Sequence, residues 1–490
     1  MAKVFTFMNQ RIEDILRDYR RIEAISHAQR VLHWDLEVMM PEGGIDHRSE
    51  SLANIEILQR EFYLRLAEKV NSVEGDLDDI EKGIIRNLKR TIRYYSLPED
   101  LIKRIEKITT KAPLIWREAR KKSDFSMFEP SLREIVSLSR EVAEKLGYER
   151  HPYNALMDLY EEGFTVDDAN IIFSRILNET SRIMKKIEGT EFYGRHPLEQ
   201  RKYRKESMEK VNREIIKILG MPEKRFRMDV SAHPFTIGIS MDDVRITTRY
   251  EGINFKSTLF STVHESGHAI YELQKDPSLA WTPVSRAPSL GFHESQSRFF
   301  ENIVGRSREF VHLIYPVLRE NLSFINKYSE DEIYNYFNMV HPSLIRVDAD
   351  EVTYNLHIAL RYEIEKGLIE GSIDTKDLPG IWNSFMDKYL GIVPENDSQG
   401  VLQDIHWSQG SFGYFPTYTL GNVISAIIRG RFDNLSNLIA EGNIIAIRDY
   451  LREKVHRYGS IYTPKELLRI SFGEGYNPEY LLKYLEEKFS

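Results

Sequence analysis

The sequence has 490 residues, of which 41% are apolar and 29% are charged, and it contains no cysteine. A chain of this length buries a large core without cross-links, and this composition excludes collagen-like, low-complexity and disulfide-stabilised proteins. The 67 basic and 75 acidic residues give a net charge of −8, which argues against a general nucleic-acid-binding protein, because binding to phosphates needs a basic surface.

Residues 1–195 are predicted to form one helix after another. Apolar residues recur there at helical spacing, with charged residues between them. Thr165 is expected to cap the start of one helix, and Asp168 completes the pattern of a capping box. Breaks are predicted at residues 41–44 and near Pro98. The predicted helical segments are 9–37, 47–73, 76–95, 98–122, 130–148 and 166–190.

Residues 235–250 predict the clearest β element. Apolar and polar residues alternate there and the pattern turns at 242–243, as in a short hairpin. A helical pattern resumes near Ser257 and continues to the C-terminus, with loops at 276–291 and 396–415. No apolar run approaches the roughly 20 residues that span a bilayer, and the N-terminal segment lacks the apolar core of a secretory signal. We therefore expect a mainly α-helical, cytoplasmic protein with a small β element and no membrane partner.

The strongest functional motif is His264-Glu265-Ser266-Gly267-His268, in the apolar, helix-compatible stretch 257–273. On a helix, residues four apart share a face, so His264 and His268 can reach one metal ion. Glu265 would lie beside that ion, where its carboxylate can take a proton from an activated water and return it to the leaving amine. Because the chain has no cysteine, the third ligand must be His, Asp or Glu.

Glu294 is the predicted third ligand. It opens a second helical stretch in His293-Glu294-Ser295-Gln296, far enough after His268 for a loop and a return helix. An HExxH motif followed by a Glu on the next helix is typical of the gluzincin branch of zinc peptidases. The expected cofactor is one zinc ion, with cobalt or manganese as substitutes in a site of this kind. Glu301, two helical turns after Glu294, is expected to support the ligands from behind.

Further segments extend the similarity beyond the metal motif. They are Trp34-Asp35 with Met40-Pro41-Glu42-Gly43-Gly44, His233-Pro234-Phe235, Asp243-Val244-Arg245-Ile246-Thr247, His293-Glu294-Ser295-Gln296, Ile345-Arg346-Val347-Asp348-Ala349-Asp350 and Gly400-Val401-Leu402-Gln403-Asp404-Ile405-His406-Trp407. Together with HESGH they span residues 34–407, and their sequence and order resemble the Taq-type thermostable metallocarboxypeptidase family.

The resemblance implies a fold and an activity. The fold is a large, mainly α-helical, gluzincin-like metallopeptidase body with a deep groove and a helical N-terminal lid. Residues 1–490 would form a single catalytic unit, in which a helical region, 1–195, roofs the groove of the zinc-site region, 196–490. The resemblance also implies a homodimer and an exopeptidase that releases single C-terminal residues with broad specificity.

A carboxypeptidase must hold the terminal carboxylate of its substrate, and the planar guanidinium of arginine suits that task. Arg346 is the favoured anchor and Arg245 the second. Strand alternation places Arg245 on one face with Asp243, so a structural pair with an acid is its alternative. Arg346 heads a predicted helical stretch with Asp350 four residues on, so its alternative is a structural ion pair within that helix.

His406 lies in a segment whose glycines disfavour a plain helix. By resemblance to gluzincins with a His and a Tyr beyond the metal ligands, His406 and Tyr414 are the expected oxyanion donors, with Tyr418 as the alternative to Tyr414. Simple packing is the other interpretation, because the chain has 26 tyrosines. His233 precedes a proline and is expected to contact substrate or to close a turn. Residues expected to orient His406 or the ligands are Gln403 and Asp404.

The expected function is a zinc-dependent carboxypeptidase acting on peptides with a free C-terminus. One alternative is an endo-acting helical gluzincin oligopeptidase that cuts internal bonds of short peptides. A remote alternative is an inactive metal-binding assembly protein. The intact Glu265 argues against this last class, because its carboxylate has little use beside a purely structural metal.

Overall fold

The structure, a computed structural model, describes residues 9–489 and divides the chain into two compact units. Each unit combines segments that are far apart in sequence. The first comprises Met1–Tyr95, His196–Phe337 and Ile428–Gly475, and the second comprises Ser96–Arg195, Asn338–Ile427 and Tyr476–Ser490. Across residues 9–489, no helix is both long and apolar enough to cross a membrane.

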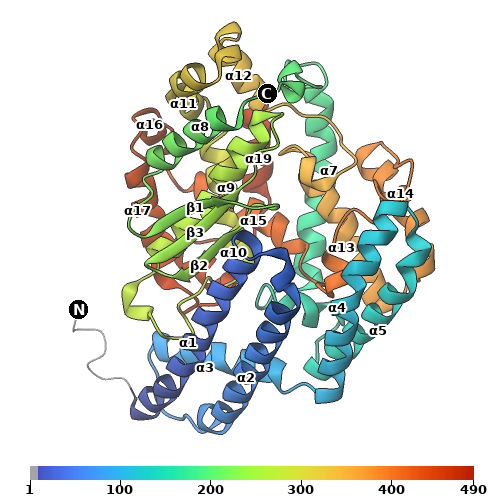
Figure 1. The fold of residues 1–490 in the computed structure, drawn as a ribbon, viewed down its shortest axis with the longest axis vertical. Coiled ribbons are helices and arrows are strands. Elements are labelled where there is room, and N and C mark those ends of the chain that lie inside the picture. The colour runs from blue at the N-terminus through green and yellow to red at the C-terminus, as the bar shows by residue number, and fades with distance from the viewer. Residues whose placement is uncertain (1–8, 490) are drawn as a thin grey trace. The chain divides into compact units, whose positions relative to one another are not determined.

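The first unit contains the predicted metal motif, on α9 and α10 (Figure 1). A π-helix, Phe299–Val304, continues directly from α10. The helices of this unit are α1 (Gln10–Val38), α2 (Ile45–Asn71), α3 (Asp79–Tyr95), α8 (Lys205–Ile218), α9 (Phe255–Gln274), α10 (Leu290–Arg298), α11 (Arg308–Asn321), α12 (Glu330–Phe337), α16 (Leu435–Ala440), α17 (Ile444–Lys454) and α18 (Pro464–Phe472).

The small sheet of the first unit confirms the predicted hairpin. Its strands are β1 (Phe226–Val230), β2 (Thr236–Ser240) and β3 (Asp243–Thr248), in the spatial order β1-β3-β2. β2 pairs antiparallel with β3, and β1 pairs parallel with β3 on its other edge. Val244 and Ile246 are fully buried, as alternation along β3 requires, and α9 packs against β2 and β3. The sheet therefore supports the helix that carries the metal motif.

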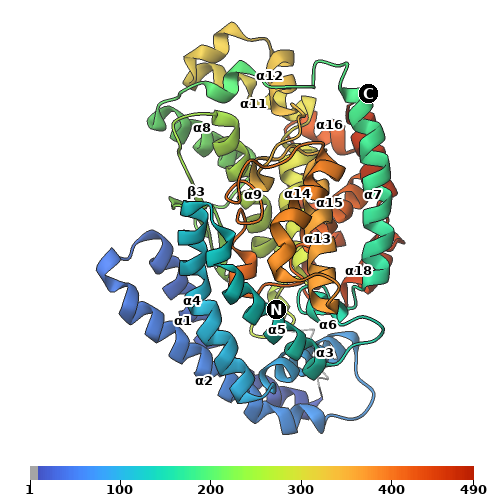
Figure 2. The same ribbon diagram turned by 90° about the vertical axis from the view of Figure 1, so that its right-hand side faces the viewer.

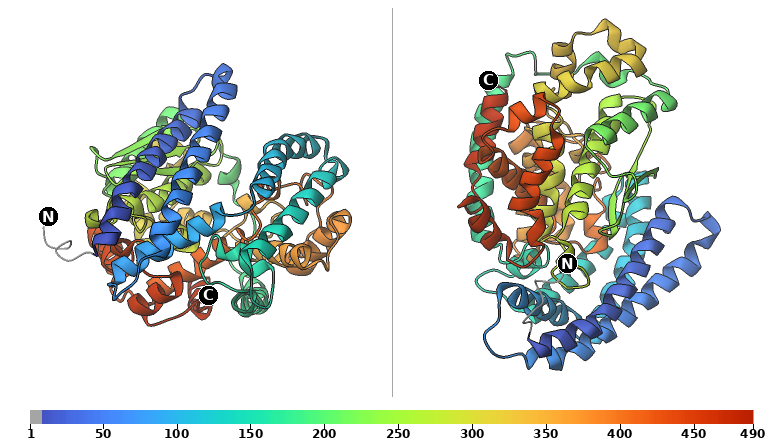
Figure 3. Two further views of the ribbon diagram at one scale, coloured as in Figure 1. Left: turned by 90° about the horizontal axis from the view of Figure 1, so that it is seen from below. Right: turned by 90° about the vertical axis from the view of Figure 1, so that its left-hand side faces the viewer.

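The N-terminal helices pack on the connection between α9 and α10. α1 and α2 run side by side as a long hairpin (Figure 3), and α3 closes a core with them. That core includes Leu279 and Val284, which lie between α9 and α10, and Ile461 from near the C-terminus. Burial of these side chains anchors the segment that joins the two motif-bearing helices.

In the described part of the second unit, the named elements are helices, and α13 lies at its centre. Residues on every side of α13 are buried, which is typical of a helix surrounded by neighbours. α14 lies beside α13 (Figure 2). The predicted capping box is present at the start of α7, between Thr165 and Asp168. The helices are α4 (Glu99–Lys122), α5 (Glu129–Leu146), α6 (Tyr153–Asp158), α7 (Val166–Ile187), α13 (Tyr354–Glu370), α14 (Leu378–Leu390), α15 (Pro416–Gly430) and α19 (Glu479–Lys488).

Candidate metal centre and associated residues

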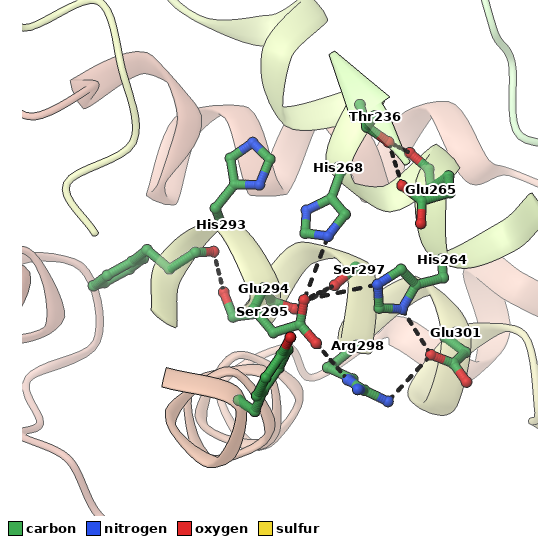
Figure 4. A network of polar contacts seen from close by, with 12 residues as sticks. Thr236, His264, Glu265, His268, His293, Glu294, Ser295, Ser297, Arg298 and Glu301 are labelled. Carbon is green, nitrogen blue, oxygen red and sulfur yellow. Dashed lines mark hydrogen bonds and ion pairs between the residues drawn. The ribbon is translucent and has the colours of Figure 1, made fainter. Parts of the chain in front are cut away.

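His264, Glu265 and His268 lie in the middle of α9, and Glu294 enters from α10 (Figure 4). The Nε2 atoms of His264 and His268 lie 3.7 Å and 3.3 Å from Glu294 Oε2. One possible ligand atom from each of these three residues lies within 4.8 Å of the others. Two imidazoles and one carboxylate that converge in this way fit a divalent cation, so the donor set matches the metal predicted from the sequence.

Basic residues hold Glu294 in its ionised form. Arg298 Nε donates to Glu294 Oε1 at 2.7 Å from one turn further along the same helix. Burial acts to raise the pKa of Glu294, but Arg298 and the histidines His264 and His268 hold that pKa well below its ordinary range. A carboxylate that stays charged when buried is the form that binds a metal ion.

Glu301 supports the first histidine from behind, as its spacing from Glu294 predicts. It lies in the π-helix, and its Oε2 is 2.8 Å from Nδ1 of His264. Arg306 donates to its other oxygen at 2.9 Å. The contact fixes the imidazole plane of His264 and directs Nε2 toward Glu294.

His268 is oriented differently. Its Nδ1 is buried and has no hydrogen-bond partner among residues 9–489. Its ring instead stacks on His293, with centroids 4.5 Å apart and planes inclined by 19°. His293 Nε2 in turn lies 3.0 Å from Glu272 Oε1, and Lys275 donates to the other oxygen of Glu272. The two histidines of the motif are thus held by a hydrogen bond in one case and by ring stacking in the other.

Glu265 points toward β2 and is buried. Thr236 Oγ1 donates to Glu265 Oε2 at 2.6 Å and lies 3.0 Å from its backbone oxygen (Figure 4). Burial raises the pKa of Glu265, against the lowering effects of His264 and of the Thr236 hydroxyl. Thr236 was not among the site residues expected from the sequence, although its place in the hairpin directly before α9 was the available signal.

Replacing Glu301 with glutamine should weaken metal binding without removing a ligand. The amide retains a neutral contact to His264 Nδ1 but loses the negative charge that strengthens this ligand. We expect the dissociation constant for zinc to rise about 10- to 100-fold, measured by competition with a chromophoric chelator. The exposed Glu320→Gln on α11 is the control. Equal zinc affinity in Glu301→Gln and wild type would contradict this role for Glu301.

Arg245 and His233 lie near the sheet of the first unit. Arg245, on β3, forms two hydrogen bonds of 2.7 Å with Asp243, and its guanidinium lies 5.4 Å from the centroid of the Trp34 ring. His233 is exposed in the turn between β1 and β2, and its carbonyl accepts a hydrogen bond from Ser231. Arg245 thus has the structural partner that the sequence offered as its alternative.

Arg346 lies in the second unit and forms a buried structural ion pair, the alternative given for it above, but with Asp404 rather than with Asp350. Residues 346–348 form a short 3₁₀ turn rather than the start of an α-helix, so Arg346 and Asp350 are not one helical turn apart. Asp350 instead accepts hydrogen bonds from backbone N–H groups, including that of Thr353, just before α13. Arg346 is buried and pairs with Asp404 at 2.9 Å, and Asp404 also binds Arg361.

His406 and its neighbours form an irregular loop, as predicted. A 3₁₀ turn covers residues 406–409, and His406 Nε2 lies 3.3 Å from the Tyr418 hydroxyl. The rings of His406 and Tyr414 are 5.4 Å apart. Burial lowers the pKa of His406 to about 4, against the raising effect of Asp404. Gln403 and Asp404 bind Arg346 and Arg361 through hydrogen bonds. The structure thus brings His406 and Tyr414 of this loop together with Tyr418 of α15.

A buried carboxylate that the sequence analysis did not identify lies behind this loop. Glu365, on α13, is fully buried and accepts hydrogen bonds from the Trp407 indole, the Gly413 amide and the Tyr153 hydroxyl. Burial raises its pKa to about 7, although these three donors and Arg361 act to lower it. A Glu within a helix has no local sequence feature that would predict such contacts.

Stability should therefore depend on pH through Glu365. The folded protein binds this proton more tightly than the unfolded chain, whose Glu titrates near 4.5. The resulting stabilisation is complete below about pH 4.5 and is lost as pH rises through 7. The difference in free energy of unfolding between wild type and Glu365→Gln should fall by on the order of 3 kcal/mol from pH 4.5 to 8. Denaturant titrations at several pH values would measure it, and a constant difference would contradict the raised pKa.

Comparisons with known proteins cover nearly the whole chain. The family model for carboxypeptidase Taq (M32) metallopeptidase matches residues 14–489. Thermostable carboxypeptidase 1 of Pyrococcus furiosus is 48% identical over 495 residues, with 99% of each chain covered. Carboxypeptidase 1 of Bacillus subtilis is 34% identical over 482 residues, with 96% of each covered. The apo-Mg structure of the Pyrococcus furiosus carboxypeptidase has a TM-score of 0.97 and 47% identity, and covers 99% of this chain and 100% of its own. Trypanosoma cruzi metallocarboxypeptidase 1 has a TM-score of 0.91 and 34% identity, over 98% and 99% respectively.

Proposed function

The chain belongs to the carboxypeptidase Taq (M32) metallopeptidase family and is a metal-dependent carboxypeptidase, and we propose that it is a zinc enzyme that releases single C-terminal residues from peptides with broad specificity. The observation that supports this most is the convergence of His264, His268 and Glu294. Two imidazoles and a carboxylate, with no sulfur ligand, suit zinc, and cobalt or manganese are the proposed substitutes.

Glu265 is the proposed general base. When bound, a divalent metal supplies a Lewis acid that polarises the scissile carbonyl and acidifies the attacking water. Glu265 takes the proton of that water and later gives it to the leaving amine. Its burial favours proton uptake, and the hydroxyl of Thr236 holds the carboxylate in one orientation.

The remaining site residues are proposed from the resemblance. His406 and Tyr414 are the proposed donors to the developing oxyanion, with Tyr418 as the alternative to Tyr414. Arg346, and after it Arg245, is the proposed anchor for the terminal carboxylate. Each guanidinium already binds an acidic side chain, so an anchor would share its remaining N–H groups with the substrate. The same proposal includes a substrate contact at His233.

We also propose the assembly and location that the sequence predicts. These are a single catalytic unit of 1–490 with residues 1–195 as its helical lid, a homodimer, and a cytoplasmic location. Sedimentation equilibrium of the purified protein tests the homodimer, because a monomer mass at micromolar concentration would contradict it.

A peptide in two forms, free acid and C-terminal amide, separates the proposed exopeptidase from an oligopeptidase. The carboxypeptidase should shorten only the free acid, one residue at a time, because its anchor needs a terminal carboxylate. Removal of the metal by a chelator should abolish the ladder, and added zinc should restore it. The measurement is a mass-spectrometric time course.

Three outcomes would contradict this proposal in whole or in part. Internal fragments from both peptide forms would identify an endo-acting enzyme and remove the need for a carboxylate anchor. A ladder that persists after complete metal removal would separate the activity from the cluster of His264, His268 and Glu294. If cobalt or manganese restores the stepwise cleavage and zinc does not, the proposed mechanism stands but the proposal that the metal is zinc is wrong.

A further inference from the structure

The loop that carries His406 and Tyr414 is held from its buried side by one carboxylate. His406 is followed by Trp407, and Tyr414 is preceded by Gly413. The Trp407 indole donates to Glu365 Oε1 at 2.8 Å, and the Gly413 amide donates to Glu365 Oε2 at 2.9 Å. One side chain therefore binds both ends of the segment between the two proposed oxyanion donors.

Burial alternates at the two ends of this segment. Trp407 and Gly413 are buried, whereas the adjacent His406 and Tyr414 are partly exposed. The contacts to Glu365 hold the buried residues in place, and the residues next to them present their rings 5.4 Å apart. Each ring therefore lies directly beside a residue that this carboxylate binds.

Oε2 of Glu365, which binds Gly413, also accepts a hydrogen bond from α6. The Tyr153 hydroxyl donates to Glu365 Oε2 at 2.5 Å. Gly413 has φ of +94°, and a Cβ there would lie 2.6 Å from the backbone carbon of Leu156. The loop thus lies directly on the α6 backbone, and Glu365 binds both the helix and the loop.

A buried carboxylate is a costly way to fill this space, since an apolar side chain would need no donors. Its value lies in having two equivalent acceptor oxygens at a fixed separation. We propose that Glu365 is a positioning residue that sets the placement of His406 and Tyr414 for the reaction. This inference rests on the proposed function of those two residues, and Glu365 itself acts only through them.

Glu365→Gln is the informative variant. The amide has one oxygen and one NH₂, so in either orientation its NH₂ faces a donor, the indole of Trp407 or the amide of Gly413. One of the two attachments must fail. We expect kcat for peptide hydrolysis to fall about 10- to 100-fold, with KM and zinc affinity within about twofold of wild type, because a displacement of about 1 Å has effects of that size.

Trp407→Phe provides a rescue test when it is combined with Glu365→Gln. Phenylalanine has no N–H, so the NH₂ of the introduced amide can turn toward it while the amide oxygen still accepts from Gly413. The double variant should therefore have a kcat within about twofold of Trp407→Phe alone, rather than the product of the two losses. Tyr153→Phe is the matched control. It removes a donor from the same carboxylate without touching the loop, and its kcat should stay within about twofold of wild type.

Hydrogen exchange measures how firmly the loop is held, independently of peptide hydrolysis. Backbone amides of residues 406–415 should exchange faster in Glu365→Gln than in Tyr153→Phe. A wild-type kcat in metal-loaded Glu365→Gln, equal losses in Glu365→Gln and Tyr153→Phe, or multiplied losses in the double variant would each overturn the proposal.

The proposed function can fail separately. If His406→Ala and Tyr414→Phe retain the wild-type kcat, these two residues are not the oxyanion donors, and the positioning role in the reaction falls with them. If both lower kcat while Glu365→Gln does not, the donors stand and only the inference about Glu365 is wrong.

Discussion

Glu265→Gln should lower kcat by about 10²- to 10⁴-fold while the protein retains its metal. The substitution preserves the size of the side chain and an oxygen that can accept from Thr236, so the local packing on β2 persists. It removes the group that takes the proton of the attacking water. The ligands His264, His268 and Glu294 are untouched, and the zinc content, measured by atomic absorption, should therefore equal that of wild type.

Thr236→Val tests how much the orientation of Glu265 contributes, because it removes the hydrogen bond to the carboxylate but leaves the carboxylate itself. The valine has nearly the same shape but donates no hydrogen bond to the carboxylate of Glu265. Loss of one such charged contact should cost roughly tenfold in kcat, much less than loss of the carboxylate itself. Glu265→Gln with wild-type kcat would remove the proposed base, and a Thr236→Val variant as inactive as Glu265→Gln would mean that the hydroxyl does more than orient it.

The two histidine ligands of the metal centre could be predicted because residue spacing within a single helix brings them together. His264 and His268 are one turn apart within α9, so α-helical periodicity alone places them on one face. The lack of cysteine restricted the remaining ligand to residues of the type that α10 supplies. The spacing of Glu301 from Glu294 predicted that it supports the ligands, but not that its partner is His264 or that a π-helix carries it.

The other contacts depend on segments that are distant in sequence. Asp404 lies 58 residues after Arg346, the residue it binds, and nothing in the local pattern favours it over Asp350. Thr236 reaches Glu265 only through the packing of β2 on α9. Glu365 binds three donors that come from α6 and from the loop after Gln403. Such contacts form only when separate helices, strands and loops pack together. The spacing of residues within one helix or strand does not determine that packing.

The division of the chain into two compact units also depends on packing that local residue spacing does not determine. Residues 9–95 belong to the unit that holds the metal motif, whereas residues 96–195 belong to the unit that holds Arg346 and His406. Both stretches have the same helical pattern in sequence. Their different partners depend on which apolar faces match, as with Leu279 and the helices of the N-terminal core.

Gly267→Ala should destabilise the protein and weaken zinc binding, although the same change in a helix usually stabilises by about 0.5 to 1 kcal/mol. α9 and α10 approach so closely at Gly267 that a Cβ there would lie 2.5 Å from the carbonyl oxygen of Gln296 and 2.7 Å from Cα of Ser297. Both are backbone atoms of α10, so relief requires the helix itself to move.

That movement would separate the ligands. Glu294 lies on α10 in the same turn as Gln296, and a shift of this helix away from α9 draws its carboxylate from His264 and His268. Overpacking of this kind costs about 1 to 3 kcal/mol in stability. We expect zinc affinity to fall at least about 100-fold as well, because the distances among three ligands change together.

Gly380→Ala is the matched control for this prediction. Gly380 lies in the first turn of α14, where nothing stands within 4 Å of an added Cβ. That variant should be as stable as wild type or slightly more stable, with unchanged zinc affinity. The measurements are thermal unfolding of the metal-free proteins and chelator competition for zinc. If Gly267→Ala and Gly380→Ala have the same stability and the same zinc affinity, the close approach of α9 and α10 does not set the geometry of the metal centre. If Gly267→Ala lowers stability and zinc affinity while Gly380→Ala lowers neither, the close approach does set it.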